Sequence, residues 1–155
     1  MINPSDERFM RAALDEAREA LSRGEVPIGA VLAKDGAVIC RTHNSPITLQ
    51  DPTAHAEILA LRKAGQQLNN YRLIDAELYV TLEPCIMCMG ALVHARVKRL
   101  IFGARDPKAG AAGSIFDLTR HEKLNHAIEV TAGVLAEECG ELLQNFFREK
   151  RSSGQ

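Results

Sequence analysis

Hydrophobic residues in the first 42 positions predict one helix followed by a β-hairpin. After the candidate N-cap Ser5, apolar residues recur at helical spacing until Gly24, a residue that commonly ends helices. Two short β-prone runs follow, 26–33 and 37–42, and the turn residues Lys34-Asp35-Gly36 separate them. The buried stripe expected for the helix consists of Met10, Ala13, Ala17, Ala20 and Leu21.

Helices and strands alternate in the remaining chain. The pattern predicts a helix from His55 to about Leu68, a second over 85–94, and strands over 78–82, 97–102 and 128–131. A terminal helix is predicted by the spacing of Leu135, Cys139, Leu142, Leu143, Phe146 and Phe147. A hairpin followed by this alternation indicates an α/β fold, a three-layer α/β/α sandwich with a mixed five-stranded sheet.

Length and composition indicate a single domain over residues 1–151, with a polar end, 152–155, that is expected to be frayed. The N-terminus lacks the features of a signal peptide, and no apolar run is long enough to span a bilayer. We therefore expect a soluble cytoplasmic protein with no membrane partner. Because 19 basic residues are balanced by 20 acidic ones, the overall field does not attract polyanions, and any nucleic acid must be held locally.

The four cysteines fall into two classes. Cys40 and Cys139 have apolar neighbours and are expected to pack as small buried hydrophobes. Cys85 and Cys88 follow a strand and Pro84, which suits a helix start. Their spacing of three places both sulfurs on one face of the helix, and its N-terminus favours the thiolate form, which binds metal. In a reducing cytosol such a pair is a zinc or redox site rather than a structural disulfide.

His55 supports the zinc interpretation. With Cys85 and Cys88 it would supply three ligands, the number found in catalytic zinc sites that leave a fourth position for water or substrate. The alternative is a closed structural site, in which His55 is an ordinary helix-start residue. Its fourth ligand would then be a spare cysteine or one of the histidines His43, His94, His121 and His126.

Glu57 favours the catalytic interpretation. Two positions along a helix separate side chains by about 200°, so Glu57 is poorly placed to bind the same metal as His55. In the first helical turn, however, it can approach the open metal position from a different side. Zinc lowers the pKa of bound water towards about 7, and Glu57 could carry the released proton to a substrate nitrogen. This chemistry is hydrolytic deamination, and H-x-E with P-C-x-x-C is the signature of zinc nucleobase deaminases.

Nearly the whole chain resembles the bacterial tRNA-specific adenosine deaminases of the cytidine deaminase superfamily. The resemblance rests on EVPIGAV from Glu25, Asn44, DPTAHAE from Asp51, NYRLIDAELYVTLEPCIMCMGA from Asn70, and FGARDPKAGAAGS from Phe102. It implies a cytidine deaminase-like fold, one Zn²⁺ per chain, a homodimer, and conversion of adenosine to inosine at the wobble position of a tRNA anticodon. The chain departs from the family mainly in the first helix, the hairpin turn and residues 119–123, so the role of 119–123 is left open.

Carried over by position, the resemblance implies that His55, Cys85 and Cys88 bind zinc and that Glu57 shuttles protons. It also implies that the substrate RNA is contacted by Asn44, Val26, Leu82, Asp106, Phe147 and Arg148. Asn44 would form a hydrogen bond with the base, and Val26 and Leu82 would line the pocket. Asp106 would accept a hydrogen bond from a sugar hydroxyl of a flanking nucleotide.

Each RNA contact has a structural alternative. Asn44 precedes Ser45-Pro46 and Asp106 precedes Pro107, so both could shape turns. Val26 and Leu82 are equally compatible with a core. The terminal run 146–151 combines aromatic and basic residues. Its apolar half could instead pack the last helix against the sheet, and its basic residues could simply complement the helix dipole. We expect Phe146 in the core and Phe147 and Arg148 at the anticodon loop, because bases of single-stranded RNA stack on aromatic side chains.

Three functions are weighed on this basis. The leading one is a tRNA-editing adenosine deaminase, and the second is a deaminase of a free base or nucleoside with the same zinc chemistry. The third is a non-catalytic, zinc-stabilised RNA-binding module.

Three basic residues are expected on a solvated or dimer-facing surface: Arg96, Lys98 and Arg99.

Overall fold

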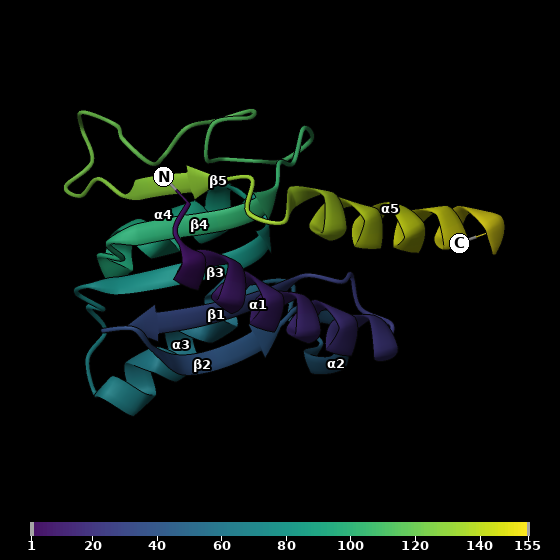
Figure 1. Ribbon diagram of the computed structural model, residues 1–155, viewed down its shortest axis with the longest axis horizontal. Helices are drawn as coiled ribbons and strands as arrows, with labels where there is room; N and C mark the ends of the chain where they lie inside the picture. Colours follow the sequence, from purple (N-terminus) through teal and green to yellow (C-terminus); the bar gives the residue numbers. More distant parts are fainter. Residues whose placement is uncertain (1, 155) are drawn as a thin grey trace.

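The computed structural model describes residues 2–154, which form one mixed sheet covered on both faces by helices (Figure 1). The strands lie in the order β2-β1-β3-β4-β5. Strand β1 pairs antiparallel with β2 and β3, whereas β3, β4 and β5 are parallel. The bounds are β1 Gly29–Lys34, β2 Ala37–His43, β3 Ala76–Leu82, β4 Arg99–Ala104 and β5 Glu129–Ala132. The predicted mixed five-stranded sheet is confirmed.

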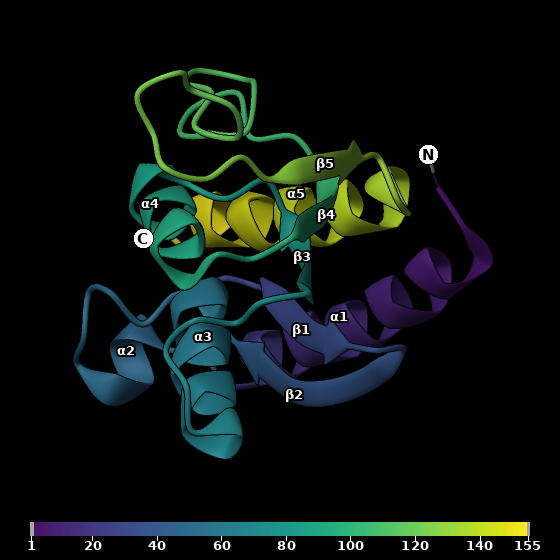
Figure 2. The ribbon, with the colours of Figure 1, turned by 90° about the vertical axis from the view of Figure 1, so that its left-hand side faces the viewer.

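Two pairs of helices form the outer layers. Helices α1 (Pro4–Ser22) and α5 (Ala136–Ser152) cover one face, and α3 (Ala56–Leu68) and α4 (Ile86–Ala95) cover the other (Figures 1 and 2). The sheet contributes alternate residues to a separate apolar core on each face, which is the pattern expected of a strand buried on both sides. The last turns of α5 extend beyond the sheet in Figure 1. These layers confirm the predicted sandwich.

The hairpin forms as predicted, but its first strand begins later. Asp35 and Gly36 both have positive φ, 53° and 77°, as a two-residue type I′ turn requires. Strand β1 starts at Gly29 rather than at Val26, because the carbonyl of Val26 accepts a local bond from the Ile28 N–H (2.8 Å). A Cβ atom at position 29 would overlap the backbone of α1, so glycine is needed for this helix to lie against the sheet.

The ends of several helices differ from the prediction. Asn3, not Ser5, caps α1 through a reciprocal capping box with Asp6, and Leu21 of the predicted buried stripe is 36% exposed. Cys85 is the N-cap of α4, so Pro84 lies before the helix rather than within its first turn. A short helix, α2 (Pro46–Leu49), occupies a segment for which no element was predicted. Such boundaries depend on contacts that periodicity does not contain.

The expected surface position of Arg99 is wrong. Its side chain is 11% exposed, and its guanidinium group donates two hydrogen bonds to the fully buried carboxylate of Asp6, at 2.6 and 2.8 Å. Tyr79 also donates to Asp6 (3.1 Å), and Arg99 donates to Thr131 (2.8 Å). These bonds attach the N-terminal turn of α1 to the start of β4, because a buried carboxylate needs a partner to remain charged.

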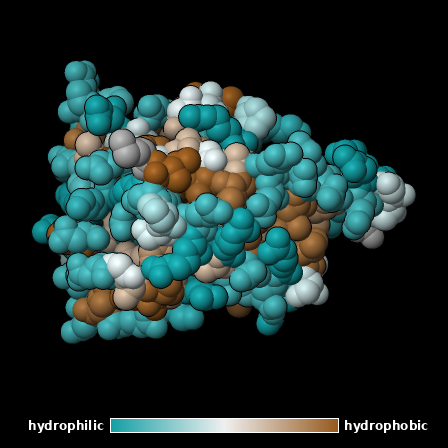
Figure 3. Space-filling model, in the orientation of Figure 1, coloured by the Kyte–Doolittle hydropathy of each residue, from teal (hydrophilic) through white to brown (hydrophobic). Residues whose placement is uncertain are grey.

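The chain end and the surface complete the description. Helix α5 includes Ser152, Gln155 lies outside the described residues, and the expected fraying of 152–155 stays a prediction. Within residues 2–154, no helix combines the length and the apolar character that crossing a bilayer requires. Hydrophobic residues on the face with α1 and α5 form several patches separated by hydrophilic residues (Figure 3).

Candidate functional site

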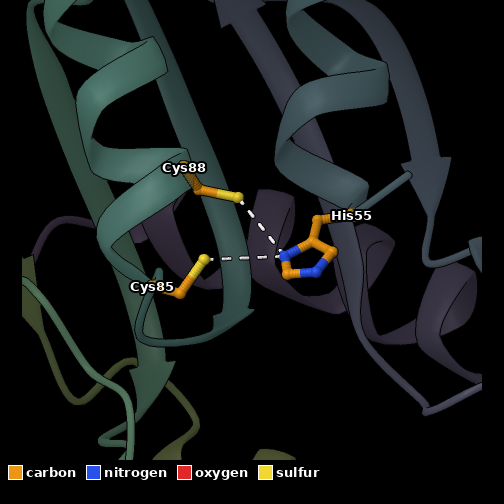
Figure 4. Close-up of side chains that lie close together, drawn as sticks. All are labelled: His55, Cys85 and Cys88. Atoms are coloured by element: carbon orange, nitrogen blue, oxygen red, sulfur yellow. Dashed lines mark hydrogen bonds between the residues drawn. The ribbon is translucent and has the colours of Figure 1, made fainter. Parts of the chain in front are cut away.

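Two helix starts bring together the predicted metal ligands. His55 is the N-cap of α3, Cys85 is the N-cap of α4, and Cys88 lies in the first turn of α4. In Figure 4 the three side chains point toward one another across the gap between these helices. The Nδ1 atom of His55 lies 3.6 Å from the sulfur of Cys85 and 3.5 Å from that of Cys88.

The donor geometry fits a tetrahedral metal ion. Zinc bonds of about 2.3 Å to sulfur and about 2.0–2.1 Å to nitrogen place two ligand atoms of a tetrahedron about 3.5–3.6 Å apart. The two observed nitrogen–sulfur distances match this edge length, and the three donor atoms all lie within 4.8 Å of one another. His55, Cys85 and Cys88 are therefore positioned to hold a metal ion.

The pKa values of the two thiols are shifted in opposite directions. The hydrogen bond from Cys88, together with the nearby His55, lowers the pKa of Cys85 to about 3. The same Cys85 sulfur and burial raise the pKa of Cys88. The lowered pKa favours the thiolate form of Cys85, and a dication would supply the positive charge needed to ionise the second thiol.

The other histidines do not complete a closed site. Among residues 2–154, the only group of metal-ligating side chains is His55, Cys85 and Cys88. His43 instead pairs with Glu16 (3.1 Å), and His126 bonds the carbonyl of Val97 (2.7 Å). Within the described residues the donor group therefore has three members, which is the number of protein ligands in catalytic zinc sites.

Glu57 is the second residue of α3 and is buried, with 4% of its surface exposed. His55 has an extended backbone (φ −74°, ψ 150°), so the two side chains do not follow helical spacing and can face the same region from different directions. Burial raises the pKa of Glu57 to about 7, and the charge of Cys85 adds to this effect. A carboxyl group of this kind can both accept and release a proton near neutral pH.

Asn44 connects the end of β2 to the start of α3. Its side-chain oxygen accepts from the backbone N–H of Ala56 at 2.8 Å, which identifies the oxygen and leaves the amide NH₂ group facing away from this bond. That NH₂ group makes no hydrogen bond within the described part of the chain. Asn44 is 6% exposed, and its bond to Ala56 gives it the structural role of its alternative interpretation.

Glu25 fixes the segment that leads into His55, and sequence reasoning missed it. Its carboxylate, 1% exposed, accepts from the N–H groups of Ile47 (3.2 Å) and Thr48 (2.7 Å) and from the Thr48 hydroxyl (2.7 Å). These bonds hold the first turn of α2. In the sequence, Glu25 stands out only as a charged residue directly before an otherwise apolar run.

A groove of about 680 Å³ contains five of the six predicted RNA contacts. Val26 and Leu82 are half-buried within it, so they are not simply core residues. Asp106 also shapes a turn, because its carboxylate accepts from the N–H groups of Lys108 and Ala109. The lining residues are Val26, Leu82, Ala104, Arg105, Asp106, Pro107, Lys108, Gly140, Leu143, Gln144, Phe147, Arg148 and Arg151.

Helix α5 supplies one side of this groove. Phe146 is 8% exposed and packs in the core, as expected, whereas Phe147 is 45% exposed and faces the groove. Arg105 and Lys108 add cations that the sequence did not single out, and Arg151 belongs to the C-terminal basic run. Arg105 and Lys108 directly flank Asp106-Pro107, and this position was the local sign of their role.

Known proteins match the chain over nearly its full length. The family model described as MafB19-like deaminase matches residues 4–151. The tRNA-specific adenosine deaminase of Haemophilus influenzae is 53% identical over 147 residues, covering 94% of this chain and 85% of that protein. The enzyme of the same description from Bacillus subtilis is 51% identical, covering 94% and 91%.

A solved structure also matches, with a TM-score of 0.85 and 49% identity. It covers 88% of this chain and 99% of the other, and comes from a study of A-to-I editing by tRNA:A34 deaminases at the wobble position of transfer RNA. This match confirms the cytidine deaminase-like fold that the resemblance implies. The chain belongs to the MafB19-like deaminase family and, within it, to the tRNA-specific adenosine deaminases.

Proposed function

We propose that the chain hydrolyses adenosine to inosine at the wobble position of a tRNA anticodon, with one zinc ion held by His55, Cys85 and Cys88. When bound, zinc supplies an acidified water as the nucleophile. The observation that carries the proposal is the open three-donor cluster with the buried carboxyl group of Glu57 beside it. The names of the close relatives supply the substrate.

Glu57 acts as the proton carrier. Its carboxylate accepts a proton from the attacking water and delivers it to a ring nitrogen of the adenine base. A second transfer protonates the exocyclic amino group, which leaves as ammonia while the ring carbon keeps the oxygen. The pKa of about 7 suits both transfers, because the group must be easily charged and easily neutralised.

The remaining predicted residues hold the RNA. Asn44 offers its amide NH₂ group to the base, and the half-buried Val26 and Leu82 form the apolar part of the pocket. Phe147 provides an exposed ring for stacking, and Arg148 with its neighbouring cations meets the phosphates. Asp106 faces the same groove, where it accepts from a ribose hydroxyl.

The direct test is to incubate the zinc-loaded protein with an unmodified tRNA carrying a wobble adenosine and to measure inosine by mass spectrometry. We expect inosine at the wobble position and none with Glu57→Ala, which retains the zinc. Activity on free adenosine or guanine without activity on tRNA would replace the proposal with the free-base alternative. RNA binding without any turnover would favour the non-catalytic module.

The homodimer and the cytoplasmic location are also proposals: the first rests on the resemblance to the family, and the second is the expectation drawn from the sequence. Sedimentation velocity of the zinc-loaded protein tests the first, with a mass near twice 17.0 kDa expected. Fractionation of cells that express the chain tests the second. A monomer that is fully active on tRNA would contradict the proposed assembly.

A further inference from the structure

Glu83 is a buried carboxylate with no role in the mechanism described above. It lies between the end of β3 at Leu82 and the metal ligand Cys85, and it is 2% exposed. Its Oε1 atom accepts from the N–H of Asp106 (3.0 Å) and from the hydroxyl of Ser114. Its Oε2 atom accepts from the N–H groups of Ala112 (2.9 Å) and Ser114 (3.0 Å).

The backbone around Glu83 binds the same loop. The N–H of Glu83 donates to the carbonyl of Ala104 (2.8 Å), and the carbonyl of Pro84 accepts from the N–H of Ala111 (2.8 Å). A Cβ atom at Gly110 would overlap the Glu83 carboxyl group, so the loop closes around the carboxylate only because position 110 is glycine. The loop over residues 105–114 is therefore folded around this one side chain.

This loop forms one side of the RNA groove. It contributes Arg105, Asp106, Pro107 and Lys108, while α5 contributes Phe147, Arg148 and Arg151. The bond from the Asp106 N–H connects a groove residue directly to Glu83, and Glu83 is two residues from Cys85. These bonds connect the groove wall to the segment that carries the metal ligand Cys85.

We propose that Glu83 is a positioning residue for RNA recognition: it holds the loop over 105–114 at a fixed place beside the metal cluster. The nucleotides that flank the reacting adenosine then meet Asp106 and Lys108 in register with the base in the pocket. The inference rests on the proposed tRNA deamination, and it assigns Glu83 no part in the chemical step.

The Glu83→Gln variant tests this assignment with little change in volume. An amide has one acceptor oxygen, so it can keep either pair of donors but not both. If it keeps the N–H groups of Ala112 and Ser114, its NH₂ group faces the N–H of Asp106, and the groove residue is released. We expect the KM for an anticodon stem-loop to rise about tenfold, which corresponds to about one lost hydrogen bond.

We expect the KM to change, while kcat stays within about twofold of the wild-type value and the zinc content stays at one per chain. Asp6→Asn is the matched control, because it also neutralises a buried carboxylate but acts at the opposite end of β4. It should lower thermal stability without changing KM. An unchanged KM in Glu83→Gln, or an equal change in the control, would overturn the proposal.

A double-mutant cycle with Lys108→Ala separates positioning from a general loss of stability. If Glu83 acts through the groove wall, the two changes are not additive, because a displaced Lys108 has already lost its contact. Additive effects would contradict the inference. Ser114→Ala, which removes only one donor, serves if Glu83→Gln does not fold: a KM rise of about threefold supports the role, and no rise refutes it. Wild-type protein that forms no inosine in the same assay would instead refute the proposed function.

Discussion

Replacing Arg148 with alanine should reduce the salt dependence of RNA binding by a predictable amount. The groove contains four cationic side chains, those of Arg105, Lys108, Arg148 and Arg151, on a chain whose net charge is −1. Each phosphate neutralised in single-stranded RNA contributes about −0.7 to the slope of log K against log salt. Four contacts give about −2.8, and Arg148→Ala should give about −2.1.

These slopes predict a clear difference in affinity. Between 0.1 and 0.3 M salt, the binding constant should fall about 20-fold with all four cations and about tenfold without Arg148. Fluorescence anisotropy of a labelled anticodon stem-loop measures it, in a Glu57→Ala background so that the RNA is not converted. Arg18→Ala is the control, because it removes the same charge from the exposed surface of α1, where Arg18 pairs with Asp15.

The slope of the control variant should equal that of the protein with all four groove cations. A slope unchanged by Arg148→Ala would mean that this side chain does not neutralise a phosphate. Equal reductions in both variants would mean that RNA responds to the overall charge rather than to the groove. Either result would refute the reasoning that a nearly neutral chain holds RNA through local cations.

Three further predictions concern the metal, acid stability and packing. Cys88→Ser should retain well under one zinc per chain after gel filtration, measured by elemental analysis, while Glu57→Ala retains one. Burial opposes ionisation of Asp6, but the hydrogen bonds from Arg99, Asn3 and Tyr79, together with the charge of Arg99, outweigh burial and lower the pKa below 3.8. The stability from Asp6 is therefore complete above pH 3.8 and is lost as the pH falls through the lowered value, so Asp6→Asn should flatten the acid side of a Tm-against-pH curve. Gly29→Ala should cost about 3 kcal/mol in urea unfolding, because its Cβ overlaps the backbone of α1; a cost under about 1 kcal/mol would contradict the close packing.

Features that depend on sequence neighbours were predicted well. The hairpin turn at Asp35-Gly36 and the alternation of strands and helices follow from backbone preference and from the period of apolar residues. The structure also brings together His55, Cys85 and Cys88, whose residue types and spacing at helix starts indicated a metal site. Helix ends were less accurate, since the cap at Asn3 depends on a side-chain bond with Asp6 rather than on periodicity.

Features that depend on distant contacts were missed. Arg99 is separated by 93 residues from Asp6, so no local pattern distinguishes it from a surface arginine. Glu83 looks like part of a metal motif, and its bonds with the loop over 105–114 become visible only when β3 and β4 lie side by side. The same pairing brings Lys108 to the groove that α5 borders.

The last turns of α5 extend past the sheet in Figure 1, and Arg148 and Arg151 of this helix line the groove. A purification tag or fusion partner joined after α5 would consequently emerge near the proposed RNA groove, and an acidic one would compete with phosphates for these cations. The beginning of α1 lies away from the end of α5 in both Figures 1 and 2. Fusion ahead of α1 therefore suits work with RNA, whereas a removable C-terminal domain offers a way to block the groove and reopen it on cleavage.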